Sequence, residues 1–393
     1  MVAVLALGLL RPSAGPGAGP AERPVASAVA SPQAPATPTA STSPAPTRAS
    51  PGPAPSAPAP DPLPPAAREG LVLSAEREGA PLPVGGMVME VFPVDAQRLF
   101  GVSLAGHMDY LQCGPVPRRL GRVPGPATQG TLNGAAYDRA RGVFYLGNAP
   151  RAQVRRWKLS AEGKPEYQPP LQHSEQEARP VAVLPDGRVL VGGDRRISVW
   201  SPEGAPAGEL RIPDEVPGHM LMLVPGDGVV FASRYTRSRG KAAGSLHRLE
   251  LATGKHARVP IEVAPFGLDL SADRRFLAVG DARAQLHVYR ALDLELLWSA
   301  PTRELEPGED HAFVHPVAWT HDGTFVLSGD ARGVVRVFRA RSGGAPVFAW
   351  TAQPPLSDGR PDWVTKLVIR EPRVYTGGNW GEVNVWLLRG RSE

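Results

Sequence analysis

The sequence predicts an all-β fold, a seven-bladed β-propeller of four-stranded antiparallel blades, over residues 70–391 of the 393-residue chain. Three observations predict it. No Phe, Tyr or Trp precedes Phe92, so only the later part of the chain can build a large core. From residue 71 onward, short apolar runs are bounded by Gly, Asp, Asn or Pro, which is strand and turn chemistry. The same pair of strands then recurs at a steady spacing.

The repeat unit is an apolar strand, a glycine-containing turn, and a second strand that closes on a large side chain. The clearest copies close on Trp157, Trp200, Tyr289, Phe338 and Trp386. Two weaker copies close near Leu111 and Leu249. Successive anchors are 46, 43, 49, 40, 49 and 48 residues apart. A period in the mid-forties is typical of a four-stranded propeller blade, so seven repeats predict seven blades.

The ends of the repeat region predict how the ring closes. In the sixth repeat, strands are expected at residues 315–320, 325–329, 334–340 and 346–351. The seventh repeat ends after its third strand, at about Leu388, and lacks an outer strand. Residues 71–76 form a strand with no blade of their own. We predict that this N-terminal strand completes the last blade and removes the exposed sheet edges.

The first 69 residues differ sharply from the rest. Residues 1–10 are an apolar run that matches the core of a secretory signal peptide, truncated because no positive residue precedes it, or else simply a hydrophobic amino terminus. Residues 11–69 are rich in Pro, Ala and Ser and are expected to be a disordered linker. We therefore expect an exported protein of the periplasm or cell envelope; the alternative is a cytoplasmic one.

Composition excludes some classes of function. The formal net charge is +5, but Arg supplies 38 of the 43 basic residues, a bias typical of GC-rich bacterial genomes. The basic residues form no stripe with stacking aromatics, so no nucleic-acid partner is expected. Cys113 is the only cysteine, which excludes an intramolecular disulfide and a cysteine-rich metal site.

The third repeat, residues 180–200 (PVAVLPDGRVLVGGDRRISVW), resembles a WD-repeat in its Asp-Gly turn and its Trp-terminated third strand. The resemblance covers essentially residues 71–390 and implies a propeller that scaffolds protein complexes. It also implies a structural role for Trp157, Trp200 and Trp386, and for Asp194. Asp194 stands where the family has a turn Asp that hydrogen-bonds a His and a Ser or Thr. Other repeats have Arg151, Arg283, Arg332 and Trp380 there, so the chain resembles a degenerate member.

Loops are the place to look for function, because packing accounts for the strands. In a propeller, the connections from outer strand to next inner strand share one face with those from second to third strand. The longest connections belong to this set, at residues 121–130, 169–179, 301–314 and 352–363. We call this side the long-loop face and expect it to bind a protein partner.

Three features of that face are candidates. The acidic loop 301–314 and the basic insertion between the second and third strands of blade four are either solvated charge or sectors that orient a charged partner. Two tryptophans near blade seven either cap the core or anchor a partner. The candidate partner-binding residues are Trp363, Trp380, Asp310, His311, Arg237 and Arg239.

The alternative is a propeller enzyme, lactonase- or quinoprotein-like, with a site in the central channel. The only His-rich stretch holds His311, His315 and His321. The last two lie about 20 Å apart along an extended strand, too far for one metal. The sequence also lacks a phosphate-binding glycine loop and a nucleophile elbow. We therefore expect a non-catalytic scaffold, a monomer without cofactor or metal whose propeller does not insert into a membrane.

Overall fold

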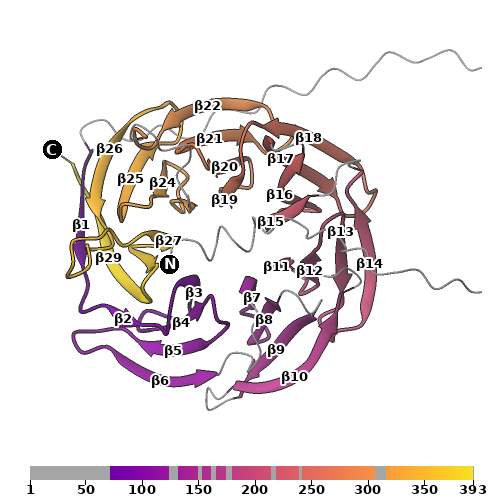
Figure 1. Ribbon diagram of the computed structural model, residues 1–393, viewed down its shortest axis with the longest axis horizontal. Coiled ribbons are helices and arrows are strands. Elements are labelled where there is room, and N and C mark those ends of the chain that lie inside the picture. Colours follow the sequence, from indigo (N-terminus) through magenta and orange to yellow (C-terminus); the bar gives the residue numbers. More distant parts are fainter. Residues whose placement is uncertain are drawn as a thin grey trace, which may run out of the picture. The chain divides into compact units, whose positions relative to one another are not determined.

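The computed structural model describes residues 71–123, 132–148, 153–160, 165–173, 179–213, 218–238, 241–305 and 316–392. These residues form strands and turns, with no helix, and hence no helix that could cross a membrane. Their strands make seven antiparallel sheets arranged as the blades of a ring (Figure 1). The predicted seven-bladed β-propeller is confirmed.

Blades one to four follow one another in chain order, each with its first strand innermost. Blade one contains β3 (Val88–Pro93), β4 (Arg98–Ser103), β5 (Met108–Gln112) and β6 (Arg118–Val123). Blade two contains β7 (Leu132–Asp138), β8 (Val143–Asn148), β9 (Gln153–Leu159) and β10 (Pro165–Gln172). Blade three contains β11 (Arg179–Val183), β12 (Val189–Gly192), β13 (Arg196–Trp200) and β14 (Pro206–Arg211). Blade four contains β15 (His219–Pro225), β16 (Val229–Ser238), β17 (Lys241–Glu250) and β18 (His256–Ile261).

The last three blades complete the ring. Blade five contains β19 (Pro265–Leu270), β20 (Phe276–Asp281), β21 (Gln285–Arg290) and β22 (Leu296–Pro301). Blade six contains β23 (Val317–Trp319), β24 (Phe325–Gly329), β25 (Val334–Arg339) and β26 (Gly343–Thr351). Blade seven contains β27 (Val364–Arg370), β28 (Arg373–Gly378), β29 (Glu382–Ser392) and β1 (Leu71–Arg77), with β2 (Leu82–Pro83) also paired to β29.

The core is divided among the joints between blades. Buried apolar side chains form seven clusters, and each cluster draws residues from two neighbouring blades. Every repeat anchor lies in a third strand, opposite a buried apolar residue of the second: Trp157 faces Phe144, and Phe338 faces Val326. The repeat period in the mid-forties therefore corresponds to one blade, and each added blade creates one more joint with its neighbour.

Ring closure occurs as the sequence predicts. Strand β1 pairs antiparallel with β29 without a register shift, from Leu71 opposite Ser392 to Arg77 opposite Trp386. It is the outermost strand of blade seven (Figure 1). Because β1 comes from the start of the propeller and β29 from its end, their hydrogen bonds hold the two ends of the ring together.

The closing segment does more than add a strand. After β1, the carboxylate of Glu78 accepts two hydrogen bonds from the Arg373 guanidinium at 2.5 and 2.7 Å, which lowers the pKa of Glu78. The chain then buries Leu82 and Val84, 1% and 4% exposed, in the cluster between blades seven and one. The repeat pattern does not predict this buried apolar segment at Leu82 and Val84.

Some strand boundaries differ from the sequence-based expectation. In blade six, β26 begins at Gly343, earlier than expected, because that glycine adopts a φ of 60° and pairs with Arg339 across a register shift. In blade two, β10 extends to Gln172, so Pro169 and Pro170 lie in a strand and not in a loop. Both prolines lie at a register shift of an outermost strand, where no ladder N–H is needed.

The face opposite the long-loop face carries the short turns between first and second strands, and its blades are tied together by arginines. Arg139 of blade two and Arg370 of blade seven both donate to the carbonyl of Val94 in blade one, at 3.0 and 2.9 Å. The Arg141 guanidinium likewise reaches the carbonyl of Asp186 in the next blade. On the short-turn face, these backbone carbonyls therefore accept hydrogen bonds from side chains of neighbouring blades.

We expect Leu73→Asp to lower the free energy of unfolding by more than about 2 kcal/mol, because Leu73 packs in the cluster between blades six and seven. Chemical denaturation followed by circular dichroism measures the change. The matched control is Ser74→Asp, on the exposed side of the same strand, which should change stability by less than about 0.5 kcal/mol. Equal stabilities for the two variants would contradict a closing role for β1.

Candidate functional site

One large hydrophobic side chain stands out on the long-loop face. Trp380 is 41% exposed in the turn between β28 and β29 of blade seven. The other exposed large hydrophobics of the described residues lie on outermost strands or in turns between third and fourth strands. They are Val72, Val116, Leu120, Tyr167, Leu292, Leu296 and Val347. Within the described part of the chain, Trp380 is therefore the exposed large hydrophobic residue of this face.

Arg360 holds the Trp380 ring from one side. Its guanidinium carbon lies 5.0 Å from the ring centroid, which is cation–π geometry. Arg360 also pairs with Asp358 at 2.6 Å in the connection between β26 and β27. Because both charges are largely exposed, the pair itself stabilises little. Its effect is to orient the guanidinium over the indole.

A buried carboxylate holds the turn that carries Trp380. Asp362 is 3% exposed and accepts hydrogen bonds from the backbone N–H of Asn379 at 2.8 Å and of Trp380 at 3.3 Å. Burial raises the pKa of Asp362 to about 6. Glycines make the close approach possible: a Cβ on Gly378 would lie 2.3 Å from the Asp362 carboxylate, and Gly381 has a φ of 92°.

Beneath this turn lies a fully buried hydrogen-bond network. The Gln353 amide donates to the carbonyl and hydroxyl of Thr376 at 2.8 and 3.1 Å. The Trp386 indole donates to the same hydroxyl at 3.2 Å, and Asn384 donates to Gln353 at 2.7 Å. The Trp380 turn thus rests on a base whose side chains are held in one arrangement.

Some of the candidate partner-binding residues lie near Trp380 on the long-loop face, and others fall outside the residues that the structure describes. Trp363 precedes β27 directly, half-buried, at the same end of blade seven as Trp380. Arg237 lies in β16 opposite Ala242, in the long hairpin of blade four. Asp310, His311 and Arg239 lie outside the described residues.

Asp194 links blade three to blade four. Its carboxylate lies 3.3 Å from Nδ1 of His219, and its carbonyl accepts a hydrogen bond from the Arg234 guanidinium at 2.7 Å. Arg234 is fully buried. The structure thus places the Asp194 carboxylate beside a histidine of the next blade, and its carbonyl accepts one N–H of the buried guanidinium.

Blades five and six use a different turn carboxylate, two residues earlier than the family position. Asp281 accepts the backbone N–H of Arg283 and of Gln285, at 2.8 and 3.0 Å. Asp330 repeats this pattern with Arg332 and Val334 at 2.8 and 3.0 Å. The sequence analysis missed these residues because it counted back from the anchor and not forward from the Gly-Asp pair.

A second repeated position also escaped the sequence analysis. Two residues before each anchor, every third strand carries a polar side chain: Asp109, Arg155, Ser198, His247, His287, Arg336 and Asn384. Several bond to a neighbouring element, as His287 does to Asp281 at 2.9 Å and Ser198 to His173 at 2.9 Å. Alignment of the repeats on their anchors would have revealed this position, which serves hydrogen bonding within the ring.

Ser245, His247 and His256 form a chain of hydrogen bonds like that of a nucleophile, a base and an orienting group. The Ser245 hydroxyl lies 2.7 Å from Nε2 of His247, whose Nδ1 lies 2.8 Å from His256. Ser245 is only 1% exposed and His247 is fully buried, so a substrate cannot reach the hydroxyl. Burial lowers the pKa of His247 to about 2, with Arg234 nearby adding to the effect. These three hydrogen-bonded side chains are therefore part of the structural core.

The innermost strands carry charged groups that interact with neighbouring blades. Glu90 of β3 and Lys366 of β27 form an ion pair at 2.7 Å and keep about a fifth of their side-chain area exposed, 17% and 21%. Asp269 of β19 accepts the backbone N–H of Trp319 at 2.8 Å. Burial raises the pKa of Asp269 to about 6 and also raises that of Glu90.

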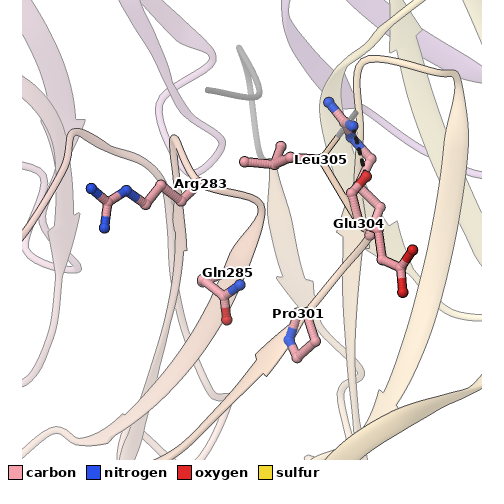
Figure 2. A pocket seen from close by; sticks show the side chains of 6 residues that line it. Arg283, Gln285, Pro301, Glu304 and Leu305 are labelled. Atoms are coloured by element: carbon pink, nitrogen blue, oxygen red, sulfur yellow. Dashed lines mark hydrogen bonds between the residues drawn. The ribbon is translucent and has the colours of Figure 1, made fainter. Parts of the chain in front are cut away.

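An open depression of about 640 Å³ lies on the long-loop face of blade five, beside the start of the connection to blade six (Figure 2). Its described lining is Arg283, Gln285, Pro301, Arg303, Glu304 and Leu305. Arg303 donates to the carbonyl of Glu304 at 3.1 Å, and Arg283 pairs with Glu262. The lining mixes both charges and contains no Ser, Cys or His nucleophile, so it contributes polar surface to the face.

Comparison of the chain with models of known protein families gives no match, and comparison with curated proteins gives none either. The functional argument therefore rests on the residues and geometry described above.

We expect Asp362→Asn to be as stable as the wild type, or more stable, at pH 7.5. The folded-state pKa of about 6 exceeds the ordinary aspartate value of 3.8, so the wild type loses stability as pH rises from about 4 to 6, whereas the variant does not. The advantage of the variant should disappear at pH 4. Urea unfolding of both proteins at the two pH values measures this. Asp362→Ala, which removes the acceptor, should be less stable at both.

We also expect His247 to make the fold acid-sensitive. Its folded-state pKa lies far below the ordinary histidine value of 6.5, so its contribution to stability is complete above pH 6.5 and is lost as pH falls below that value. The wild type should lose up to about 1.4 kcal/mol more per pH unit than His247→Gln between pH 6 and 4. If the free energy of unfolding falls with pH equally in both proteins, protonation of His247 does not destabilise the fold, and the expectation is wrong.

Proposed function

We propose that this chain is a non-catalytic binding protein that uses the long-loop face of its propeller to bind a protein partner, with Trp380 as the central anchor. The observation that carries the proposal is the exposure of Trp380 on that face, 41% of its surface, on a buried and hydrogen-bonded support. A tryptophan side chain buries a large area when a partner covers it.

Trp and Arg are the residue types most enriched among binding hot spots, and here Arg360 and Trp380 are stacked in advance. Because Asp362 holds the Trp380 backbone, little conformational freedom remains to be lost on binding. The partner that fits best presents an apolar surface to the indole and a carboxylate to Arg360. Trp363, at the same end of blade seven, extends the proposed surface.

We further propose that the propeller is WD-repeat-like and acts as a scaffold. The contacts among Gln353, Thr376 and Trp386 support this, because they resemble the family network with Gln in place of His. The contact between Asp194 and His219 supports it too. In that family, the usual role of the fold is to assemble protein complexes.

The second candidate function is a channel enzyme, and one specific observation favours it. Glu90, Lys366 and Asp269 place charged groups on the innermost strands, and burial raises the pKa of both carboxyls. Raised carboxyl pKa values occur at sites of acid–base chemistry, but also in structural ion pairs. Substitution Glu90→Gln should abolish an activity in the channel and leave partner binding unchanged.

The test of the binding proposal is capture of a protein from extracts of the source cell by the immobilised full chain. Trp380→Ala and Arg360→Glu should each remove the captured protein, and with purified partner Trp380→Ala should weaken binding at least about tenfold. Calorimetric titration measures the affinity.

The matched control is Tyr167→Ala, which truncates an aromatic side chain that is 58% exposed on the outer strand of blade two. This variant should bind like the wild type. A partner retained equally by Trp380→Ala and Arg360→Glu would place the binding surface elsewhere and overturn the proposal.

A further inference from the structure

The outer rim of the propeller is asymmetric in charge. The outermost strands of blades one to four, β6, β10, β14 and β18, each carry at least one Arg or Glu. By contrast, residues 296–301 of β22, 343–351 of β26 and 71–75 of β1 contain no charged side chain. These three segments, on blades five, six and seven, are called the uncharged rim below.

The uncharged rim is one continuous surface. Strand β26 contacts both β22 and β1, and the three strands follow one another along the perimeter (Figure 1). Of its 20 residues, five in β22, eight in β26 and five in β1 are exposed or half-buried. Leu296 is 50% exposed, Val347 40% and Val72 49%.

Large side chains lie at the base of this surface. Phe348 and Trp350 of β26 stack with ring centroids 5.6 Å apart, and both are only partly buried. Trp298 of β22 is half-buried and donates its indole N–H to the carbonyl of Ala340 at 2.7 Å. Uncharged edge strands that expose apolar residues are the kind of sheet edge that soluble proteins normally protect with charges or proline. Here only Pro346 and Pro301 do so.

We propose that the uncharged rim is the surface through which two copies of this chain associate. In a two-fold dimer the same patch faces itself, so a charge that lies close to the axis meets its own copy, which has the same sign. A patch without charges avoids that repulsion, whereas the charged outer strands of blades one to four would incur it.

The size of the rim agrees with this occupant. Its 18 accessible residues approach the roughly 20–30 residues per side of a standard protein interface. A membrane surface fits less well, because binding to anionic lipid favours basic side chains, which the rim lacks. The proposal departs from the monomer that the sequence analysis expects, and it is independent of the binding site at Trp380, which lies on the long-loop face.

Sedimentation velocity of the full chain over about a hundredfold range of concentration tests the proposal, because mass action shifts a dimer toward monomer on dilution. The wild type should change from dimer to monomer across that range. Val347→Glu and Leu296→Glu should each weaken dimerisation by at least about tenfold, because each would bury a carboxylate in the interface between the two copies. Both side chains are exposed, so both variants should melt like the wild type at concentrations at which the wild type is a monomer.

The matched controls are Leu120→Glu and Tyr167→Glu, which introduce the same charge at exposed apolar positions on the outer strands of blades one and two. They should dimerise like the wild type. A monomer at every concentration would overturn the proposal, as would a dimer equally sensitive to all four substitutions. Binding of the wild type, but not Val347→Glu, to uncharged phosphatidylcholine vesicles without dimerisation would assign the rim to lipid.

Discussion

The pairing of β1 with β29 is the interaction on which the rest of the propeller depends. Each of the seven apolar clusters needs two neighbouring blades, and the cluster between blades seven and one forms only if the ring closes. The closing segment supplies both hydrogen bonds and apolar surface, since Leu82 and Val84 fill that joint after β1 has paired. Closure also places Gly381 against the carbonyl of Val84, which ties the closing segment to the turn that carries Trp380.

The two faces of the ring differ because their backbone groups are used differently. On the short-turn face, Arg139 and Arg370 occupy carbonyls of the neighbouring blade. On the long-loop face, Asp362 and Gln353 hold a turn from below and leave its tryptophan exposed above. A rigid support under an exposed side chain is suited to binding, because the protein does not need to reorganise when a partner arrives.

Much of the fold could be predicted from the sequence, because the repeat anchors are local signals with a fixed period. The missing outer strand of blade seven and the unassigned segment 71–76 even predicted the closure, which the register of β1 and β29 confirms. The buried apolar segment at Leu82 and Val84 could not be predicted, because β2 has only two residues and is too short to show a periodic pattern. Gln353 was also missed, because its partner Thr376 is 23 residues away and only the folded blade brings them together.

For the candidate site, too, one part could be predicted from the sequence and another could not. Trp363 and Trp380 were nominated because a loop tryptophan is uncommon and visible in sequence, but neither the Arg360 stack nor the buried Asp362 has a sequence signature. The polar position two residues before each anchor is visible in the repeats when they are aligned on their anchors, but it does not belong to the turn pattern that the chain shares with WD-repeats. Its seven members differ in residue type and share only their place in the third strand.

The seam between β1 and β29 joins Leu71 to Ser392, so the contact that completes the ring is also among the most distant along the chain. Contacts of such long separation form late, because the intervening chain must already be ordered before their loop-closure cost is repaid. During synthesis, β1 leaves the ribosome first and has no partner until the last blade emerges. Its apolar side, at Leu71, Leu73 and Ala75, stays uncovered throughout that interval. The strand that seals the finished ring is thus the segment of the nascent propeller that most needs protection from aggregation.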